Sequence, residues 1–452
     1  MIKNSPVSVR ESKTGSYPQE IVDLVKEKRK MRSKWKRTRD PADKTAWNQL
    51  TNRVKIEIED FKSNCIQNYL SNLTYTKDSN YSLWKTTKRI KRPVNNIPPL
   101  LSEGVWIRNN QEKANLFASY LENVFSPHQS EGPENLETPP PKSPEIKIPT
   151  ISLHMLQQSI QQLGNNKAPG YDYITAEILK QCPRKALVML RRIINACFKL
   201  RYFPKMWKIA QVIMIAKPKG DTSNCASYRP ISLLPVMSKL FEKIFVCHLY
   251  PFITELIPNH QFGFRSGHST IDQVHRIVEV INKTFEDGDV CSAIFFDVAK
   301  AFDKVWHKGL IFKLHKYLPT QYAELLESYL YQRSFRIKQD QHFSELKEIK
   351  ASVPQGSVLG PILYLLYTAD LPQVKGGFTA TFADDTAFLA SGKNEYESTS
   401  RLASSVSLFV DWAKKWKIQL NEEKSIHVDF TNRRKIDSVP VRVNNTIVPY
   451  SN

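Results

Sequence analysis

The stretches SAIFFDV (residues 292–298) and FTATFADDTAFLA (residues 378–390) decide the fold. The first is a strand-like apolar run that ends on Asp297, an acid that needs a partner if it is buried. The second is a pair of short strands joined through Asp384 and Asp385, in a turn that projects both acids from its tip. We therefore expect the three carboxylates to converge. Carboxylates without His or Cys among them suit a hard divalent cation such as Mg²⁺, and two such ions can promote in-line phosphoryl transfer.

Between these stretches lies SVPQGSVLGP (residues 352–361). Gly356 and Gly360 allow the backbone to approach a ligand closely, and Pro361 can open the helix that follows. An ordinary loop before a helix would have the same composition. An Asp-Asp pair is also most often a turn cap, so the argument depends on the order of all these segments together.

Helical and strand-like segments alternate around these motifs. The spacing of apolar residues predicts a helix near 153–163, helices within 176–203, a strand over 211–217 and a helix over 235–252. Together with the acidic strands, this mixture predicts an α+β fold.

The first part of the chain has a different pattern. From residue 20 to about 73 the sequence is highly charged with apolar residues at helical spacing, and Pro41 marks a turn, which predicts a helical hairpin. Ser126 to Pro149 is rich in Pro, Glu and Ser, cannot bury a core, and is typical of an extended linker. We place a domain boundary at this linker.

Composition excludes several classes of protein. The 452 residues carry 65 Lys and Arg against 44 Asp and Glu, a net charge of +21 that predicts a polyanionic partner. Six cysteines without a CxxC pair argue against a zinc finger or a disulfide framework and favour a reducing compartment. No apolar run is long enough for a signal peptide or a membrane span.

The segment from Lys26 to Arg39 contains nine basic residues around Trp35. It is either a solvated helix face or a nucleic-acid contact, and a nuclear import signal would have the same composition.

Seven blocks of sequence occur in one order along the chain. They are KAPGYDYI (167–174), SYRPISLLPVMSKLFEKI (227–244), NHQFGFRSGHSTIDQ (259–273), AIFFDVAKAFDKVWH (293–307), SVPQGSVLGPILY (352–364), FADD (382–385) and LNEEKS (420–425). Together they resemble the reverse transcriptase of non-LTR retrotransposons, closest to LINE elements of the jockey type. The resemblance implies an RNA-directed DNA polymerase that copies an RNA template onto the 3′-hydroxyl of a DNA primer or nicked target DNA. Its implied substrates are dNTPs, and its implied cofactor is a pair of Mg²⁺ ions, with Mn²⁺ as an alternative.

The same resemblance implies a right-hand polymerase fold, in which an antiparallel palm sheet is backed by helices. Residues 1–125 would form a basic helical region, 126–150 a Pro-rich linker, 151–290 the fingers and the start of the palm, and 291–452 the palm with the catalytic site. Such families carry an endonuclease upstream, and continue into a primer-gripping hairpin and a helical thumb about where this sequence ends, so we expect neither the endonuclease nor the thumb here. The implied location is intracellular, in the nucleus after a cytoplasmic ribonucleoprotein stage.

Roles for single residues also follow from the resemblance. Asp297 and Asp384 resemble metal ligands, and Asp385 resembles the neighbouring acid of the same turn, so all three enter the expected metal site. Phe302 resembles the side chain that blocks a ribose 2′-hydroxyl, although core packing would explain it equally. The other residues that resemble nucleotide contacts are Gln355 and Gly356 at the sugar and base, Arg229 with Lys217 or Lys219 at the triphosphate, and Lys424 at the pyrophosphate. The expected nucleic-acid contacts are Arg265, Gly267 and His268, of which His268 is expected to be structural, together with Lys28, Arg29, Lys30, Arg32, Lys34, Lys36 and Arg37.

Two classes of function stay open at this point. One is an active polymerase, and the other is a non-enzymatic nucleic-acid-binding relic that keeps the basic surface without catalysis. The intact acids and Gln355 favour the polymerase, because buried acids are costly to keep without a use, whereas the expected lack of a thumb favours the relic. An RNA polymerase of the same palm type is disfavoured by the bulk of Phe302.

Overall fold

The computed structural model describes residues 17–71, 97–129, 144–218, 220–433, 439–444 and 446–451. Contacts divide the chain into two compact units, Met1–Ile97 and Pro98–Asn452, and each unit is described by itself.

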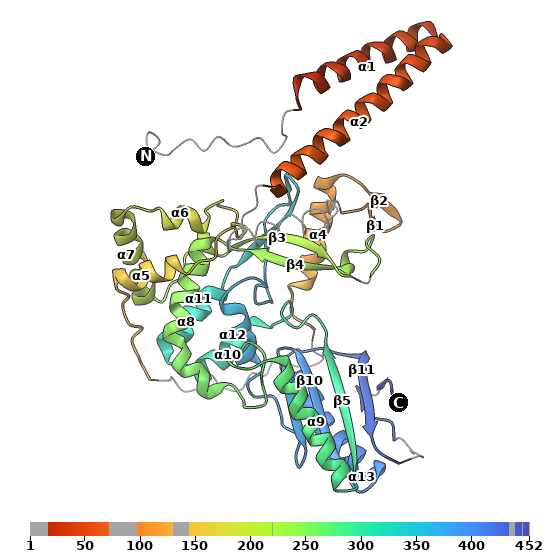
Figure 1. Cartoon of the computed structure of the whole chain (residues 1–452). Helices are drawn as coiled ribbons and strands as arrows, with labels where there is room; N and C mark the ends of the chain where they lie inside the picture. Colours follow the sequence, from red (N-terminus) through yellow and green to blue (C-terminus); the bar gives the residue numbers. More distant parts are fainter. Residues whose placement is uncertain are drawn as a thin grey trace. The chain divides into compact units, whose positions relative to one another are not determined.

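The first unit contains the predicted helical hairpin, formed by α1 (Gln19–Thr38) and α2 (Pro41–Ser71) (Figure 1). Asp43, in the first turn of α2, accepts hydrogen bonds from Lys34 Nζ at 2.8 Å and Thr38 Oγ1 at 2.7 Å. Trp35 of α1 stacks on Trp47 of α2, with ring centroids 5.3 Å apart. These contacts join the two helices near their shared turn.

A large helical core dominates the second unit. Its helices are α5 (Leu153–Gln161), α6 (Ala176–Lys180), α7 (Arg184–Leu200), α8 (Val236–Leu256), α10 (His307–Tyr317), α11 (Thr320–Leu330) and α12 (Leu359–Tyr367). They share one buried apolar cluster, which includes Phe198, Phe241 and Leu326. The helices predicted near 153–163, within 176–203 and over 235–252 are confirmed.

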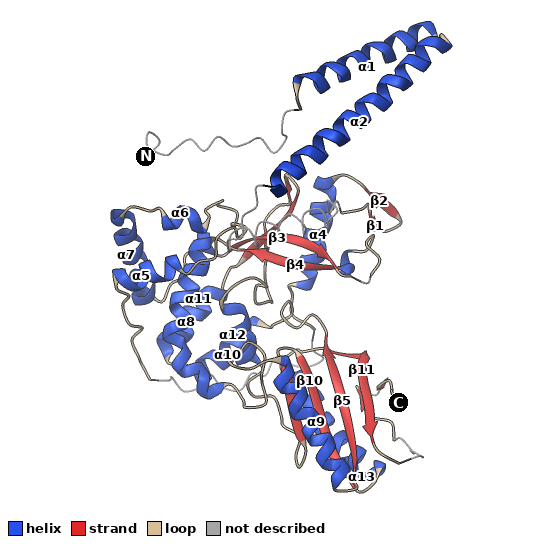
Figure 2. Cartoon of the chain, viewed as in Figure 1, coloured by secondary structure: helices blue, strands red, loops and turns tan. Residues whose placement is uncertain are grey.

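A five-stranded sheet adjoins this core (Figure 2). Its strands are β4 (Tyr228–Leu233), β3 (Ile209–Ala216), β6 (Ser334–Gln339) and β7 (His342–Phe343) in that order, with β8 (Lys347–Glu348) also paired to β6. The β3–β6 pair is parallel and the other pairs are antiparallel. Strand β3 confirms the strand predicted over 211–217.

The structure differs from the sequence-based division in one place, the segment before the expected linker. The hairpin of β1 (Leu100–Ser102) and β2 (Val105–Ile107) and the helix α4 (Asn110–Val124) belong to the second unit. Phe125, at the end of α4, accepts backbone hydrogen bonds from Lys350 and Ala351 at 2.9 and 2.7 Å, and its ring packs on Phe335. The compact division therefore falls near residue 97, because α4 packs against β6. Most of the expected linker, residues 130–143, lies outside the described residues, and the other domain boundaries stay predictions.

The second sheet holds the acidic strands, and all its pairs are antiparallel. Its order is β11 (Leu420–Phe430), β5 (Val290–Val298), β10 (Asp385–Gly392) and β9 (Phe378–Phe382), which confirms the predicted strands. Helix α13 (Glu395–Lys415) packs on one face and α9 (Thr270–Glu286) on the other (Figure 1). Because both faces are covered, β5 is apolar at successive positions instead of alternating. A small antiparallel pair, β12 (Arg442–Val443) with β13 (Thr446–Ile447), completes the described α+β fold.

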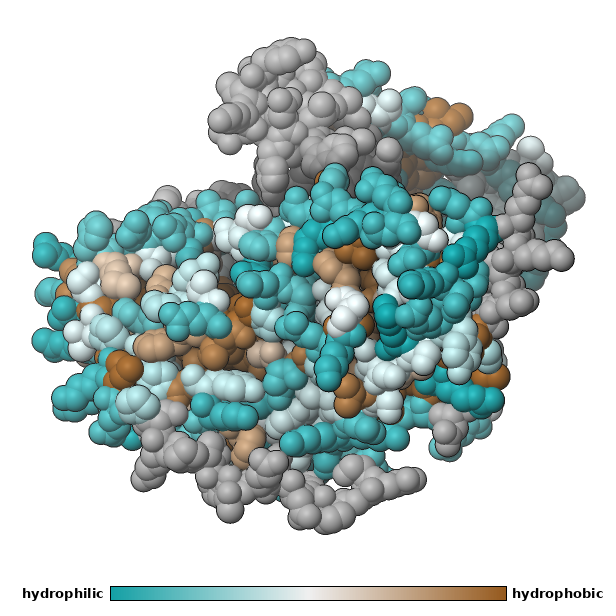
Figure 3. Space-filling view, turned by 90° about the horizontal axis from the view of Figure 1, so that it is seen from below, coloured by the Kyte–Doolittle hydropathy of each residue, from teal (hydrophilic) through white to brown (hydrophobic). Residues whose placement is uncertain are grey.

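The surface is mostly hydrophilic on the side shown in Figure 3, with smaller hydrophobic areas between the polar residues. None of the helices in the described ranges combines the length and apolarity that a membrane crossing requires.

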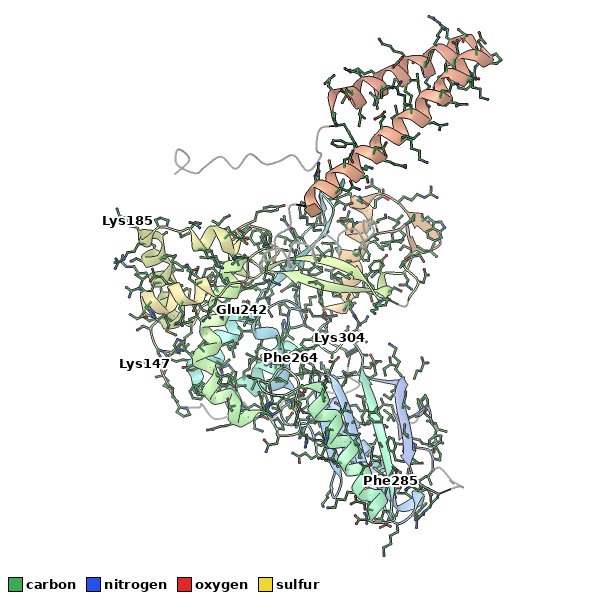
Figure 4. The ribbon with its side chains drawn as sticks, viewed as in Figure 1. Lys147, Lys185, Glu242, Phe264, Phe285 and Lys304 are labelled. Atoms are coloured by element: carbon green, nitrogen blue, oxygen red, sulfur yellow. The ribbon has the colours of Figure 1, made fainter. Side chains whose placement is uncertain are left out.

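Glu242 of α8, labelled in Figure 4, anchors the start of α12. Its fully buried carboxylate accepts hydrogen bonds from the backbone N–H groups of Val358 at 2.7 Å and Leu359 at 3.1 Å, and from Ser238 Oγ at 2.7 Å. Burial raises the pKa of Glu242, whereas these hydrogen bonds and the charge of buried Arg333 favour its ionised form. A negative charge at a helix N-terminus is stabilising, so Glu242 fixes the point where the 352–358 loop enters α12.

Glu242→Ala should lower the free energy of unfolding by about 3 kcal/mol, because it leaves buried N–H groups at the start of α12 without an acceptor. Glu242→Gln keeps one acceptor oxygen and should cost about half as much. Urea unfolding measures both values. The exposed Glu255→Ala on the same helix is the control and should change stability by less than about 0.5 kcal/mol. A loss for Glu242→Ala as small as that of the control would contradict the anchoring role.

Candidate active site

The acids gather at one end of the four-stranded sheet. Asp385 pairs with Phe382, which leaves Ala383 and Asp384 as the two-residue loop between β9 and β10. Ala383 has φ 58°, in the left-handed region that two-residue hairpin loops often require and that glycine adopts more easily. Strand β10 pairs with β5, and the last pair toward the turn is Thr386 with Phe296. If the same register continues by one residue, Asp385 lies opposite Asp297. The expected approach of the three acids is therefore built by backbone pairing.

Mutual repulsion marks this cluster. Burial raises the pKa of Asp384, and the negative charges of Asp385 and Asp297 raise it further. Burial also raises the pKa of Asp385, with Asp297 as the second cause. Lys424 Nζ lies 4.0 Å from Asp297 Oδ2, but both side chains are substantially exposed, so solvent screens this pair. Carboxylates that repel each other in this way favour a bound cation.

A cleft of about 720 Å³ opens beside the acids. Its walls come from α4, the ends of β3, β4 and β5, and the segment that follows β5. The loop before α12, Phe264 and an irregular segment of β11 that contains Lys424 complete the lining. Asp385 lines a neighbouring hollow of about 270 Å³ between α9 and the sheet. The expected site residues that line the larger cleft are Asp297, Asp384, Phe302, Gln355, Gly356, Arg229, Lys217 and Lys424.

The cleft acids fit a divalent metal ion as a partial ligand set. Within the described ranges, no three His, Cys, Asp or Glu side chains are grouped closely enough to hold a metal ion by themselves. Asp297 and Asp384 nevertheless offer hard oxygen donors in one cleft. Ions such as Mg²⁺ are commonly bound by one or two carboxylates, with water and phosphate oxygens as the remaining ligands.

Positive charges gather in the same cleft as the acids. Burial lowers the pKa of Lys217, and the nearby charges of Lys424, Arg229 and Lys300 lower it further, while Asp303 opposes them. These cations suit an anion with several negative charges, such as a triphosphate. Lys219, the sequence alternative to Lys217, lies outside the described residues.

Phe302 is held between two aromatic rings. It stacks on Tyr364 with centroids 4.6 Å apart, and meets Phe264 edge to face at 5.8 Å. Phe264 is 53% exposed and also lines the cleft, with its backbone at φ 58°. Phe302 is partly buried against the helical core, so packing accounts for part of its environment, as the sequence allowed.

The Gln355–Gly356 loop is fixed to the five-stranded sheet. Ser232 of β4 donates its backbone N–H to Gln355 O at 2.9 Å. Gly356 has φ 117°, and a Cβ there would stand 2.5 Å from Ser232 O. Both the backbone angle and the close approach therefore require glycine.

Sequence reasoning missed Asp303, a buried acid beneath this loop. Gln355 Nε2 donates to Asp303 Oδ1 at 2.9 Å. Burial raises the pKa of Asp303 to about 6, although the hydrogen bond from Gln355 and the charges of Lys300, Lys217 and Lys304 act in the opposite direction. Lys304, the next residue along the chain, is labelled in Figure 4. The available signal was a second acid, six positions after Asp297, in the stretch AFDKVW, where apolar residues stand on both sides of the Asp303–Lys304 pair. Sequence reasoning also missed Phe264 as a residue that lines the cleft, because an aromatic residue in a loop has no pattern that points to a site.

Arg265, Gly267 and His268, the residues expected near template and primer, do not line the cleft, although Phe264 of the same block does. Arg265 Nη1 donates to Pro258 O at 3.2 Å and Gln261 O at 3.1 Å, so its guanidinium braces its own loop. The ring of His268 packs against Phe262, and its Nδ1 lies 3.0 Å from Ser266 O. Gly267 has φ 74°, a turn conformation that glycine permits. The basic residues of α1 belong to the first unit and are described apart from this site.

Comparison with known proteins gives a consistent result. Residues 215–437 match the family described as reverse transcriptase (RNA-dependent DNA polymerase). The "Probable RNA-directed DNA polymerase from transposon BS" of Drosophila melanogaster is 38% identical over 430 residues, which are 91% of this chain and 47% of that protein. The corresponding polymerase from the X-element of the same species is 36% identical over 96% of this chain and 49% of its own length. The "RNA-directed DNA polymerase from mobile element jockey" of Drosophila funebris is 33% identical over 98% of this chain and 50% of its own length. The chain thus spans about half the length of these relatives.

Asp303→Asn should make the free energy of unfolding less dependent on pH. The pKa of Asp303 rises from 3.8 to about 6 on folding, so its favourable contribution is present below about pH 4 and is lost as the pH rises through 6. A rise of this size corresponds to about 3 kcal/mol. Asn keeps an acceptor for Gln355 Nε2, so the variant should be more stable than the unchanged protein at pH 8, by up to that amount. Urea unfolding at pH 4, 6 and 8 tests this, and a constant difference between the two proteins across the range would contradict it.

Proposed function

Since the chain belongs to the reverse transcriptases of non-LTR retrotransposons, we propose that it is an RNA-directed DNA polymerase. It would add deoxynucleotides from dNTPs to the 3′-hydroxyl of a DNA primer or nicked target DNA, using RNA as the template. The observation that carries this proposal is a single cleft that contains Asp297, Asp384 and a group of basic side chains. In this proposal the four-stranded sheet is the palm and the five-stranded sheet is part of the fingers.

The acids are the proposed metal site. Asp297 and Asp384 would hold the divalent ions from the cleft, and Asp385 would contribute from the adjoining strand position. When bound, two divalent ions, which we propose to be Mg²⁺, would activate the primer hydroxyl and neutralise charge on the leaving pyrophosphate. The raised pKa values of Asp384 and Asp385 support this role, because a cation relieves the repulsion that helps to raise them.

The basic residues are the proposed triphosphate site. Lys217 and Arg229 would bind phosphate oxygens and orient the nucleotide toward the acids. Lys424 Nζ lies 4.0 Å from Asp297 Oδ2, and this proximity supports a proposed role in which the ammonium group would protonate the leaving pyrophosphate.

The remaining cleft residues are the proposed sugar and base contacts. The backbone of Gly356 and the side chain of Gln355 would contact the sugar and base of the nucleotide, on a loop held by Ser232 and Asp303. Phe302 would exclude a ribose 2′-hydroxyl, with its ring fixed by the stack on Tyr364.

Other surfaces would bind the nucleic acid. The exposed basic residues of α1 would contact RNA phosphates, a contact that weakens with salt. The 258–269 loop, with Arg265, Gly267 and His268, would lie close to template and primer. Such a protein would act in the nucleus after a cytoplasmic ribonucleoprotein stage.

Asp384→Asn should reduce primer extension on an RNA template by about a thousandfold or more, because it removes a ligand of the catalytic metal ions. RNA binding should stay within about threefold, since phosphate contacts to basic residues supply most of that affinity. Asp411→Asn, on the exposed side of α13, is the matched control and should extend normally. Primer extension by Asp384→Asn at the rate of the unchanged protein would contradict the proposed metal site. RNA binding without any extension by the unchanged protein would support the relic instead.

Phe302→Ala should increase the use of rNTP relative to dNTP by roughly tenfold to a hundredfold, because the ring would no longer meet the 2′-hydroxyl. Single-nucleotide extension with each substrate measures this ratio. Phe285→Ala is the control and should leave the ratio unchanged, because Phe285, near the end of α9 and labelled in Figure 4, does not line the cleft. The same ratio in both variants would assign Phe302 to packing alone.

A further inference from the structure

A short segment before α9 runs beside the hairpin that carries Asp384. Gln261 forms a parallel bridge with Thr381 of β9. Phe262 N donates to Thr381 O at 3.0 Å, and Thr381 N donates to His260 O at 3.0 Å. The segment therefore extends the sheet by a few residues next to the catalytic turn.

The side chain of Gln261 reaches into the turn itself. Its Nε2 donates to Ala383 O at 3.1 Å, and its Oε1 accepts from Ala383 N at 2.9 Å. The same Oε1 accepts from Gly263 N at 2.7 Å. Gln261 is only 4% exposed. One buried amide thus binds both backbone groups of the residue that precedes Asp384.

Ala383 has a specific need for such a contact. Its φ of 58° is a left-handed conformation, which costs a residue with a side chain about 1–2 kcal/mol. Two hydrogen bonds from a buried amide offset a cost of this size. They also fix the peptide planes on both sides of Ala383, and with them the direction in which Asp384 leaves the turn.

Gly263 provides independent support for this close contact. A Cβ at residue 263 would stand 2.2 Å from Ala383 N and 2.8 Å from Ala383 Cα. Gly263 does not have a positive φ. Glycine is therefore required here by the approach of the two backbones, and not by its own backbone angle.

Other side chains bind the backbone at and next to Gln261 and make no bond to its side-chain amide group. Gln273 of α9 is 4% exposed, and its Nε2 donates to His260 O at 2.7 Å and Thr381 O at 2.9 Å. Arg265 Nη1 donates to Gln261 O at 3.1 Å. Helix α9 and the 258–265 loop thus brace the segment, while Gln261 alone among them bonds to Ala383 through its side chain.

We propose that Gln261 is a positioning residue, which sets the direction of Asp384 by holding both backbone groups of Ala383. Its effect on catalysis depends on the proposed polymerase function, whereas its effect on the turn does not. Small errors in the placement of reacting groups cost large factors in rate, so losing this contact should slow chemistry more than it weakens substrate binding.

The test uses Gln261→Met, which keeps the approximate size of the side chain and removes its hydrogen bonds. Amide hydrogen exchange should show faster exchange of the Ala383 N–H, by about tenfold or more, because its acceptor is lost. In single-nucleotide extension, kcat should fall by roughly tenfold to a hundredfold. The KM for dNTP and the Kd for the RNA–DNA duplex should change by less than about threefold.

Gln273→Met is the matched control. It removes two hydrogen bonds from the same network but leaves both bonds to Ala383 in place. It should lower Tm by a similar amount, while the exchange of Ala383 and kcat stay near the values of the unchanged protein. Gly263→Ala is a second variant, which should reproduce the loss of kcat with Gln261 intact, because the new Cβ displaces Ala383.

Two results would overturn the inference. One is unchanged exchange at Ala383 in Gln261→Met, and the other is an equal loss of kcat in Gln273→Met at equal Tm. If the unchanged protein extends no primer at all, the proposed function fails, and the exchange measurement still decides whether Gln261 holds the turn.

Discussion

Repulsion between carboxylates at one end of a sheet is the constraint on which the site depends. Asp297 comes from β5, and Asp384 and Asp385 from the β9–β10 turn, and their charges raise the pKa of the two turn acids beyond the effect of burial. Like charges separate unless something holds them. Here backbone pairing keeps the acids together, because the hydrogen bonds between β5 and β10 fix the strand ends that carry them. Packing on both faces of the sheet keeps these two strands paired. The apolar core under α9 and α13 is therefore also the support of a polar site.

A second group of buried polar residues supports the opposite wall of the cleft. The loop before α12 is bound by Ser232 through Gln355 O, by Asp303 through Gln355 Nε2, and by Glu242 at the first turn of the helix. Two of these three partners are buried acids whose pKa values are raised by burial. Such groups stabilise a fold weakly and can be replaced in many proteins by apolar residues. Their value here is geometric, because each fixes one point of a loop whose glycine must lie against Ser232 O.

The parts of this structure that could be predicted from sequence are those that depend on patterns among neighbouring residues. The periodicity of residues 20–73 predicted the helical hairpin, and the isolated acids at 297, 384 and 385 predicted the end of the sheet where they meet. Gln261 and Asp303 could not be assigned in this way, because their partners lie 122 and 52 positions away along the chain. A buried glutamine and a buried aspartate have no periodicity that distinguishes them from ordinary polar residues in a loop. For α4 the failure was similar: its packing on β6 joins residues on either side of the expected linker, and no composition rule reports such a contact.

The strand pairing and the contact from Gln261 hold the acids in place before any cation binds. Carboxylates that meet only when a cation arrives would need the chain to rearrange at that moment, and the reorganisation would add to the barrier. A turn held by Gln261 and a ladder held by two covered faces place the acids beforehand. The cost appears elsewhere, in the raised pKa values of Asp384 and Asp385 and in the left-handed backbone of Ala383. Strain and charge repulsion concentrated at one turn, and offset by contacts from outside that turn, are typical of a preorganised electrostatic site. The left-handed backbone of Ala383 and the repulsion between the acids are therefore offset by the hydrogen bonds of Gln261 and by the strand pairing of the sheet.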